Sequence, residues 1–229
     1  MNIYGLMKLT LLDYPGHTAC TVFLSGCNYR CPFCHNIELA RGEVPPEMDD
    51  TAFLTFLGKR KGLLDGVCFT GGEPLLTPEL PELMERVRAM GFAVKLDTDG
   101  GFPSRLENVL TRGLVDYVAM DVKNSPERYA QTVGLPKTDL APVRESIRLI
   151  KELAPDYEFR TTVVAQLHDE SSFAGIGEMI RGARRYVIQK FTDRDTVPFA
   201  GLSAPDDDKL RSYAAFMAPY AGEVLLRGI

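Results

Sequence analysis

The sequence has no apolar run close to the roughly 18 residues that a membrane-spanning helix needs. It also lacks a basic excess: its 26 Lys and Arg are outnumbered by 31 Asp and Glu, which gives a formal net charge of −5. This balance argues against a general nucleic-acid binder. Its cysteines number five, an odd count, and with no apolar signal segment they disfavour disulfide bonds. We therefore expect a protein of the reducing cytoplasm, with neither a membrane nor a nucleic acid as partner.

Low-complexity linkers and internal repeats are also missing, and no glycine-rich dinucleotide fingerprint follows the first predicted strand. The composition, 45% hydrophobic and 25% charged over 229 residues, is that of a globular protein with one substantial core. We expect a single domain over residues 1–229, with a core of about residues 16–191 and a helix and tail in 192–229. The pattern leaves open whether residues 221–229 form an edge strand or fray.

Short β-branched or aromatic runs alternate with helical patterns along the chain. The runs predict six strands, at residues 20–26, 66–72, 93–98, 116–123, 157–164 and 186–191. Apolar residues on one face predict helices at 80–91 and 143–154, and others are expected around 50–61, 104–111, 172–181 and 206–218. Strand and helix in regular alternation indicate an α/β fold with parallel strands, and we expect an incomplete (β/α)6 TIM-like barrel.

The densest chemical signal is the run CNYRCPFCHN, which contains Cys27, Cys31 and Cys34. Three thiolates on one short loop can hold three irons of a cubane cluster and leave the fourth iron open. A zinc site that also uses His35 is the alternative. However, adjacent Cys34 and His35 cannot easily turn both side chains onto one tetrahedral ion, and no second cysteine pair exists. The spacing favours the iron–sulfur interpretation.

Polar clusters follow the predicted strands where each one ends. The cysteine loop follows the first strand, Gly71-Gly72-Glu73-Pro74 ends the second, Asp97 to Gly100 ends the third, and Asp121-Val122-Lys123 ends the fourth. In parallel α/β folds the carboxyl ends of the strands meet at one rim, where ligands bind. We therefore expect one site at this rim, with Arg160 reaching it from within the fifth strand.

The motif CxxxCxxC followed by GGEP resembles the radical S-adenosylmethionine (SAM) superfamily. The flanking segments LTLLDYPGHTACTVFLSGC, PFCHN, LDTDG and AMDVK resemble the activating proteins of glycyl radical enzymes, and within that group those of anaerobic ribonucleoside-triphosphate reductase. The resemblance covers about residues 5–191. It implies a [4Fe-4S] cluster and S-adenosylmethionine as cofactors, a glycyl radical enzyme as protein substrate, and an electron donor of the flavodoxin or ferredoxin type.

The resemblance also implies roles for individual residues. By this resemblance, Cys27, Cys31 and Cys34 are the cluster ligands, and Phe33 and His35 are neighbours of the adenine. The methionyl amino group contacts Gly71, Gly72 and Glu73. Asp97 and Asp121 are a pair that shares a monovalent cation, and Lys123 is the partner of the cofactor carboxylate. Arg160 needs an anion, which is the cofactor or Glu73. In the alternative, Asp97 and Asp121 only cap the loops that follow them.

Other positions carry weaker signals. Asp99 stands where LDTNG is expected, and Thr192 and Asp193 follow the sixth strand where relatives carry a histidine. We expect His168, in QLHDES, to be a solvent-facing loop residue and His17 to lie on the surface. Cys20 and Cys68 fall within strands and are expected to be buried.

The resemblance implies that a reduced cluster cleaves the sulfonium of the cofactor, and that the resulting 5′-deoxyadenosyl radical removes hydrogen from a glycine Cα of the partner. Three alternatives remain at this point: activation of another glycyl radical enzyme such as pyruvate formate-lyase, a radical enzyme acting on a small molecule or peptide, and a zinc or electron-transfer module without catalysis. No further cysteine cluster lies near the C-terminus, which argues against maturases that carry extra clusters.

Overall fold

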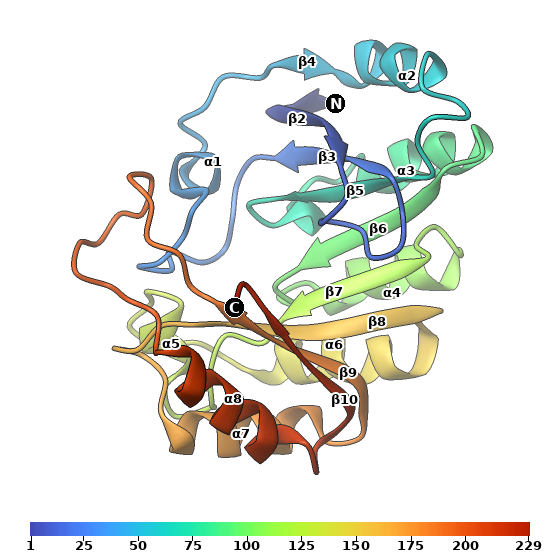
Figure 1. The fold of residues 1–229 in the computed structure, drawn as a ribbon. Coiled ribbons are helices and arrows are strands. Elements are labelled where there is room, and N and C mark those ends of the chain that lie inside the picture. Colours follow the sequence, from blue (N-terminus) through green and yellow to red (C-terminus); the bar gives the residue numbers. More distant parts are fainter.

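The six strands predicted from the sequence are all present and lie parallel in one sheet. They are β3 (Ala19–Leu24), β5 (Gly66–Gly71), β6 (Ala93–Thr98), β7 (Tyr117–Asp121), β8 (Asp156–Val163) and β9 (Ala183–Lys190). Each is hydrogen-bonded to the one before it in this list. The computed structural model describes all 229 residues, and Figure 1 shows the strands in succession from β3 to β9.

Helices connect these strands at the predicted places. They are α2 (Asp50–Gly58), α3 (Leu80–Ala89), α4 (Pro103–Thr111), α6 (Ala141–Leu153), α7 (Glu170–Ile180) and α8 (Asp207–Met217). Short helices α1 (Ile37–Arg41), α5 (Tyr129–Thr132) and the 3-10 helix η1 (Pro74–Leu76) were not predicted. Helix α7 begins at a capping box, in which Asp169 accepts from the Ser172 amide. No helix is long and apolar enough to cross a bilayer.

The sheet is wider than predicted, because both of its edges gain a strand. At one edge β2 (Gly5–Thr10) pairs antiparallel with β3, and at the other β10 (Ala221–Arg227) pairs parallel with β9. The tail therefore forms an edge strand. Strands β1 (Asn2–Ile3) and β4 (Met48–Asp49) make a separate two-stranded sheet. The large sheet runs β10-β9-β8-β7-β6-β5-β3-β2, and its two edge strands do not pair with each other. The incomplete TIM-like barrel is confirmed.

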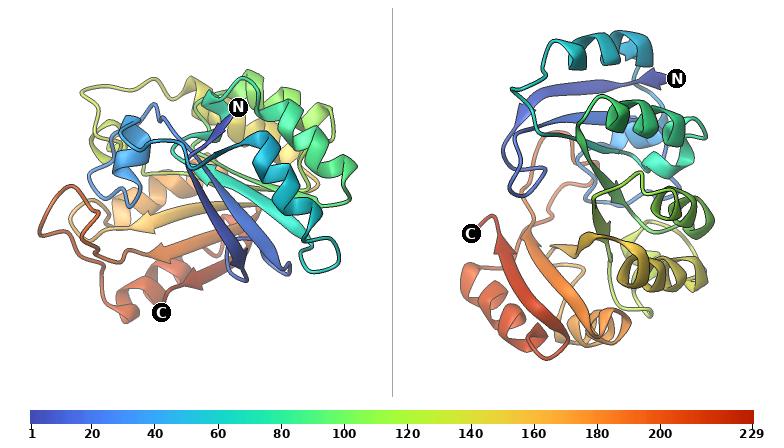
Figure 2. Two further views of the ribbon diagram at one scale, coloured as in Figure 1. Left: turned by 90° about the horizontal axis from the view of Figure 1, so that it is seen from above. Right: turned by 90° about the vertical axis from the view of Figure 1, so that its right-hand side faces the viewer.

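Alternation along the strands gives the sheet two different faces. Val94, Leu96, Val118 and Phe159 are fully buried and belong to the main hydrophobic core, which fills the space between the sheet and its helices. The residues between them on β6 and β8 are polar. Lys95 and Asp97 alternate with Val94 and Leu96 on β6, and Glu158 and Arg160 lie on either side of Phe159 on β8. Figure 2 shows the helices along the outside of the curved sheet, so the polar residues face its hollow side.

Candidate active site

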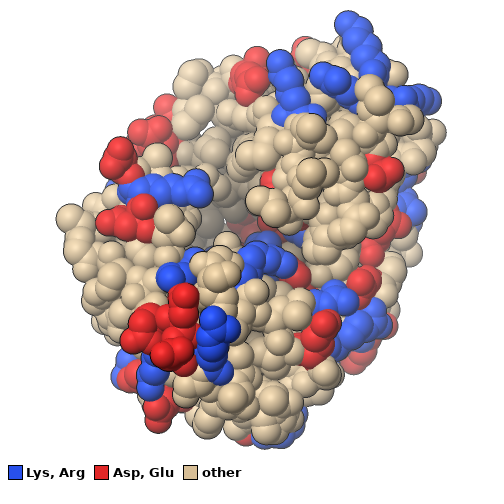
Figure 3. Space-filling view, viewed as in Figure 1, with Lys and Arg blue, Asp and Glu red and all other residues tan.

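A cavity of about 290 Å³ lies at the carboxyl ends of the strands. Every site residue predicted from the sequence lines it except Glu73, so the side chains from five strand ends do meet at one rim. The hollow is visible on the molecular surface in Figure 3. Asp13, Thr162 and Gln189 also line it. The sequence places Gln189 at this rim, within the sixth strand, but does not indicate Asp13 or Thr162.

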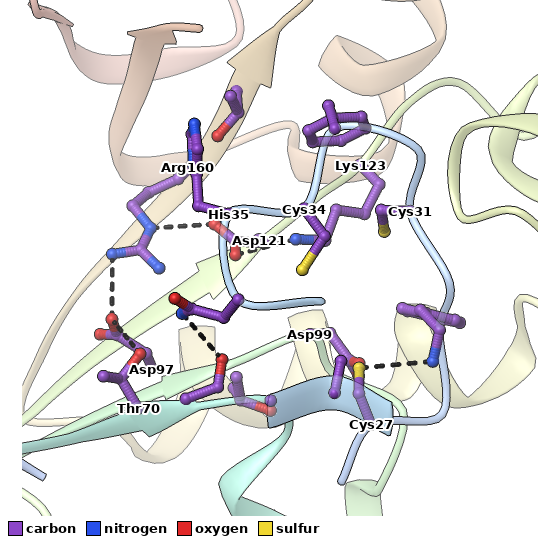
Figure 4. Close-up of a pocket in the computed structure, with 18 of the residues that line it drawn as sticks. Cys27, Cys31, Cys34, His35, Thr70, Asp97, Asp99, Asp121, Lys123 and Arg160 are labelled. Atoms are coloured by element: carbon purple, nitrogen blue, oxygen red, sulfur yellow. Dashed lines mark hydrogen bonds and ion pairs between the residues drawn. The ribbon is translucent and has the colours of Figure 1, made fainter. Parts of the chain in front are cut away.

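The cysteine loop leaves β3 and places Cys27, Cys31 and Cys34 on the cavity wall as free thiols (Figure 4). Backbone bonds fix the loop at its start and in its middle: the Gly26 amide donates to the Leu39 carbonyl at 2.8 Å, and the Arg30 amide donates to the Val133 carbonyl at 2.8 Å. Burial raises the pKa of the Cys31 thiol to about 11, with Lys123 opposing the shift. A metal that binds this thiol must therefore displace its proton.

The donor geometry separates the two metal interpretations. No group of three or more Cys, His, Asp or Glu side chains is arranged to hold a single metal ion. A zinc ion requires its donors within about 2.3 Å of one point, whereas an iron–sulfur cluster takes each thiolate on a different iron. Three free thiols that line one cavity suit this second arrangement, which favours the cluster.

The glycine pair after β5 forms a cradle that no other residue could form. Gly71 has φ +122, and a Cβ there would lie 2.2 Å from the Leu24 carbonyl oxygen; a Cβ on Gly72 would lie 2.0 Å from the carbonyl oxygen of Gly26. The Gly72 amide donates to Leu24 at 2.9 Å. The pair thus lets the end of β5 pass directly against the start of the cysteine loop, and both glycines line the cavity.

Glu73 lies behind this cradle and away from the cavity. It is fully buried and accepts three hydrogen bonds, from the Leu75 amide at 3.0 Å, the Thr98 hydroxyl at 3.0 Å and the Asp99 amide at 2.7 Å. Burial and, next, the neighbouring Asp99 raise its pKa well above the ordinary value. The structure therefore gives Glu73 a role in joining η1 to the end of β6.

Charges of alternating sign cross the hollow face of the sheet. Arg160 Nε lies 2.9 Å from Asp121 Oδ1, Arg160 Nη1 lies 3.4 Å from Asp97 Oδ2, and Lys123 Nζ lies 3.0 Å from Asp121 Oδ2. Lys95 pairs with Asp97 on the other side. Burial alone would raise the pKa of each carboxyl. The positive charges outweigh it and hold both pKa values below the ordinary range: Arg160 and Lys123 act on Asp121, and Arg160 and Lys95 act on Asp97.

This arrangement corrects the expected partner of Arg160. Its guanidinium pairs with Asp97 and Asp121 and not with Glu73. In the structure, the positively charged group between the two acids is the Arg160 guanidinium. Lys95 was not identified from the sequence as a site residue, although a lysine that alternates with Val94 and Leu96 in a buried strand indicates a charged inner face.

Asp99, the departure from the expected LDTNG, reaches the cysteine loop. Its Oδ1 accepts from the Gly101 amide at 2.8 Å and from Asn28 Nδ2 at 3.4 Å, and its Oδ2 lies 3.8 Å from Cys27 Sγ. Burial raises its pKa. The carboxyl therefore ties the end of β6 to the first cysteine, a contact that the sequence did not indicate.

Aromatic side chains close the opposite side of the loop. Phe33 meets Phe191 edge to face with 6.5 Å between ring centroids, and His35 stacks on Phe191 at 5.6 Å. His35 Nε2 donates to the Thr192 carbonyl at 2.6 Å. The cysteine loop is thus joined to the end of β9, and Phe33 and His35 both present surface to the cavity.

The remaining predictions divide. Cys20 and Cys68 are fully buried, as expected. The prediction for His168 is wrong: only 3% of the residue is exposed, and its Nε2 lies 2.9 Å from the carbonyl oxygen of Lys123. The polar neighbours in QLHDES suggest an exposed loop, but the turn folds back onto the end of β7 and buries the ring.

Comparison with known proteins agrees with this geometry. A family model described as the Radical SAM superfamily matches residues 21–171. A provisionally named glycyl-radical enzyme activating enzyme from Methanocaldococcus jannaschii is 31% identical over 99% of this chain and 96% of its own. The pyruvate formate-lyase-activating enzyme of Clostridium pasteurianum is 32% identical over 54% of this chain and 52% of its own. A radical SAM methyltransferase from Sphaerobacter thermophilus shares the fold, with a TM-score of 0.75 and 14% identity over 96% of this chain and 68% of that chain.

Proposed function

The chain belongs to the radical SAM superfamily, and from this premise we propose that it is an activating enzyme that generates a glycyl radical on a partner protein. The observation that carries the proposal is the position of the cavity. Its thiols lie on the hollow face of a sheet whose edges, β2 and β10, do not pair. An unclosed barrel leaves a side through which a segment of another chain can reach the rim.

Membership of the superfamily implies a [4Fe-4S] cluster and S-adenosylmethionine. We propose that Cys27, Cys31 and Cys34 hold the cluster, because their thiols share one cavity and suit no single ion. When bound, the two cofactors supply one-electron cleavage of the sulfonium and abstraction of a hydrogen atom. The protein's part is to position both cofactors and to exclude water.

The charged residues suit the amino-acid end of S-adenosylmethionine. Lys123 bonds to one acid, Asp121, and its ammonium group has further N–H donors for a carboxylate. We propose that Lys123 binds this carboxylate, and that Arg160 takes the place of the monovalent cation expected between the acids. The backbone of Gly71 and Gly72 would receive the amino group, and Glu73, buried behind the pair, holds the end of β6 against η1.

Phe33 and His35 would hold the adenine. Both line the cavity, and the packing of both rings on Phe191 fixes their orientation. A ring fixed in this way loses little conformational entropy when a ligand stacks on it. The cavity thus offers both charged and aromatic surface, as the two ends of the cofactor require.

Replacing Lys123 with methionine is expected to weaken cofactor binding more than cluster assembly. The substitution keeps the length of the side chain but removes a charged hydrogen bond, so the dissociation constant for S-adenosylmethionine should rise about 10- to 100-fold. Calorimetry on anaerobically reconstituted protein measures it, and iron analysis should still find about four irons per chain. Lys59→Met, on an exposed lysine at the end of α2, is the control. Equal affinity in Lys123→Met would remove Lys123 from the site.

The proposed partner is an anaerobic ribonucleoside-triphosphate reductase, with a flavodoxin or ferredoxin as electron donor. Its basis is the resemblance of the segments around the cysteines and of LDTDG and AMDVK. Pyruvate formate-lyase is the alternative partner, and the relative from Clostridium pasteurianum favours it. Mixing the reduced protein and S-adenosylmethionine with each partner in turn, followed by electron paramagnetic resonance, tests the proposal. A glycine-centred doublet should appear with one partner, and no doublet with either would contradict the activase assignment.

A further inference from the structure

His168 is a buried histidine whose two ring nitrogens both reach backbone groups of the rim. Its Nε2 lies 2.9 Å from the Lys123 carbonyl oxygen, and its Nδ1 lies 3.1 Å from the Val164 amide nitrogen and 3.2 Å from the Val164 carbonyl oxygen. The ring stands near Phe173, with 6.4 Å between centroids. It therefore bridges the end of β7 and the turn that follows β8.

The contacts select one protonation state. A carbonyl oxygen can only accept, so Nε2 must carry a proton to bond to Lys123. Burial, the largest influence, lowers the pKa of His168, which leaves the ring neutral at pH 7. Nδ1 then has a free lone pair, which accepts from the Val164 amide. The Val164 carbonyl needs no proton from the ring, because it accepts from the backbone amides of Leu167 and His168, both at 3.0 Å. The neutral ring thus donates on one side and accepts on the other.

The turn that carries His168 is itself held in place. Its Ala165 amide donates to the Ser203 carbonyl at 2.8 Å, and the Gln166 side chain donates to the Ser203 hydroxyl at 3.0 Å. A second bond joins the turn to the end of β7, from Asn124 Nδ2 to the Leu167 carbonyl at 2.9 Å. The position of the imidazole is thereby fixed relative to Lys123.

Lys123 needs such support because it lies just beyond the sheet. Strand β7 ends at Asp121, and the last backbone hydrogen bond to the neighbouring strand β8 runs from the Val122 amide to the Arg160 carbonyl at 2.8 Å. We propose that His168 is a positioning residue, which fixes the Lys123 backbone so that Nζ stays aimed into the cavity. The inference rests on the proposed contact between Lys123 and the cofactor carboxylate.

Two isosteric substitutions test this proposal. Glutamine places an amide N–H where Nε2 lies, so His168→Gln keeps the donor to Lys123; asparagine mimics only Nδ1, so His168→Asn loses it. We expect His168→Asn to weaken binding of S-adenosylhomocysteine about tenfold and His168→Gln to weaken it less than about threefold. At saturating cofactor both variants should keep the wild-type rate of cleavage. His17→Asn, at a histidine stacked on Tyr14, is the control.

Nitrogen-15 NMR of His168 provides a readout that is independent of the cofactor, since the Nε2–H tautomer should be seen in the wild-type protein. Thermal unfolding shows whether each variant folds. Equal loss of affinity in His168→Asn and His168→Gln, or no loss in His168→Asn, would overturn the positioning role. If Lys123→Met also binds normally, the proposed carboxylate contact fails as well; if Lys123→Met alone binds weakly, only the role of His168 fails.

Discussion

Cys31→Ala is expected to reduce reductive cleavage of S-adenosylmethionine to background. Cys31 lies between the other two cysteines of the loop and is 8% exposed, and alanine has no atom that can ligate iron. Removing groups that only orient a metal ligand costs about 10- to 100-fold, and removing the ligand itself should cost more. Product analysis under anaerobic conditions measures the loss, and iron analysis should show an incomplete cluster.

A buried cysteine outside the loop provides the matched control for this experiment. Cys20→Ala removes a fully buried thiol, so this variant should keep a complete cluster and substantial cleavage. Cys68 is less suitable, because its Sγ lies 3.6 Å from Lys95 Nζ and 3.8 Å from Asp97 Oδ1. Cleavage at the wild-type rate by Cys31→Ala would show that the loop has another task. One zinc and no iron in the reconstituted wild-type protein would contradict the cluster directly.

Arg160→Leu is expected to lower the free energy of unfolding by about 1.5 to 3 kcal/mol at pH 7. The variant leaves Asp97 and Asp121 without the guanidinium that lies between them, while Lys95 and Lys123 each hold only one acid. The side chains of Asp97 and Asp121 are only 16% and 24% exposed, and each keeps one lysine, so the variant loses two charged hydrogen bonds without leaving either acid unpaired. Urea unfolding of the two proteins measures the difference.

The same variant makes a prediction about pH. Arg160 contributes to holding the pKa values of Asp97 and Asp121 below their ordinary value. A lowered pKa in the folded state gives stability that is present above the unfolded pKa, about 3.9, and is lost as the pH falls through the folded value. Arg160→Leu has less of this stability to lose, so its deficit should shrink below about pH 4.

Arg148→Leu provides the matched control for Arg160→Leu. Arg148 makes two ion pairs on the exposed face of α6, with Glu145 and Glu152, and exposed pairs contribute little to stability. Both variants remove one positive charge, so the difference between their stabilities reports the effect of burial. A loss of stability in Arg160→Leu no greater than that in Arg148→Leu would mean that the charges across the sheet are not coupled.

Sequence periodicity predicted the strands and the rim because both follow from local rules. Alternating apolar residues define a strand, and the carboxyl ends of parallel strands must meet. Tertiary partners do not follow from such rules. The sequence indicates that Arg160 needs an anion. Its pairing with Asp121, however, depends on the register of β7 and β8, in which the two residues lie side by side. His168 was misjudged for a similar reason, since its burial depends on how a polar turn folds.

The edge strand β10 could not be predicted for a different reason. Residues 221–227 are partly exposed along their whole length, so they show no clear apolar alternation. Their pairing with β9 is specified by the returning helix α8, whose Leu210, Tyr213 and Met217 are buried. The strand is therefore a consequence of packing on the preceding helix, which a local pattern does not reveal.

Deuterium transfer from the partner tests the central claim most directly. The partner enzyme is produced with glycine deuterated at Cα and mixed with the reduced protein and unlabelled S-adenosylmethionine, and mass spectrometry then follows 5′-deoxyadenosine. Hydrogen abstraction from a partner glycine predicts a product that carries one deuterium and that forms in proportion to the partner added. Unlabelled 5′-deoxyadenosine, formed equally with and without the partner, would contradict the activase.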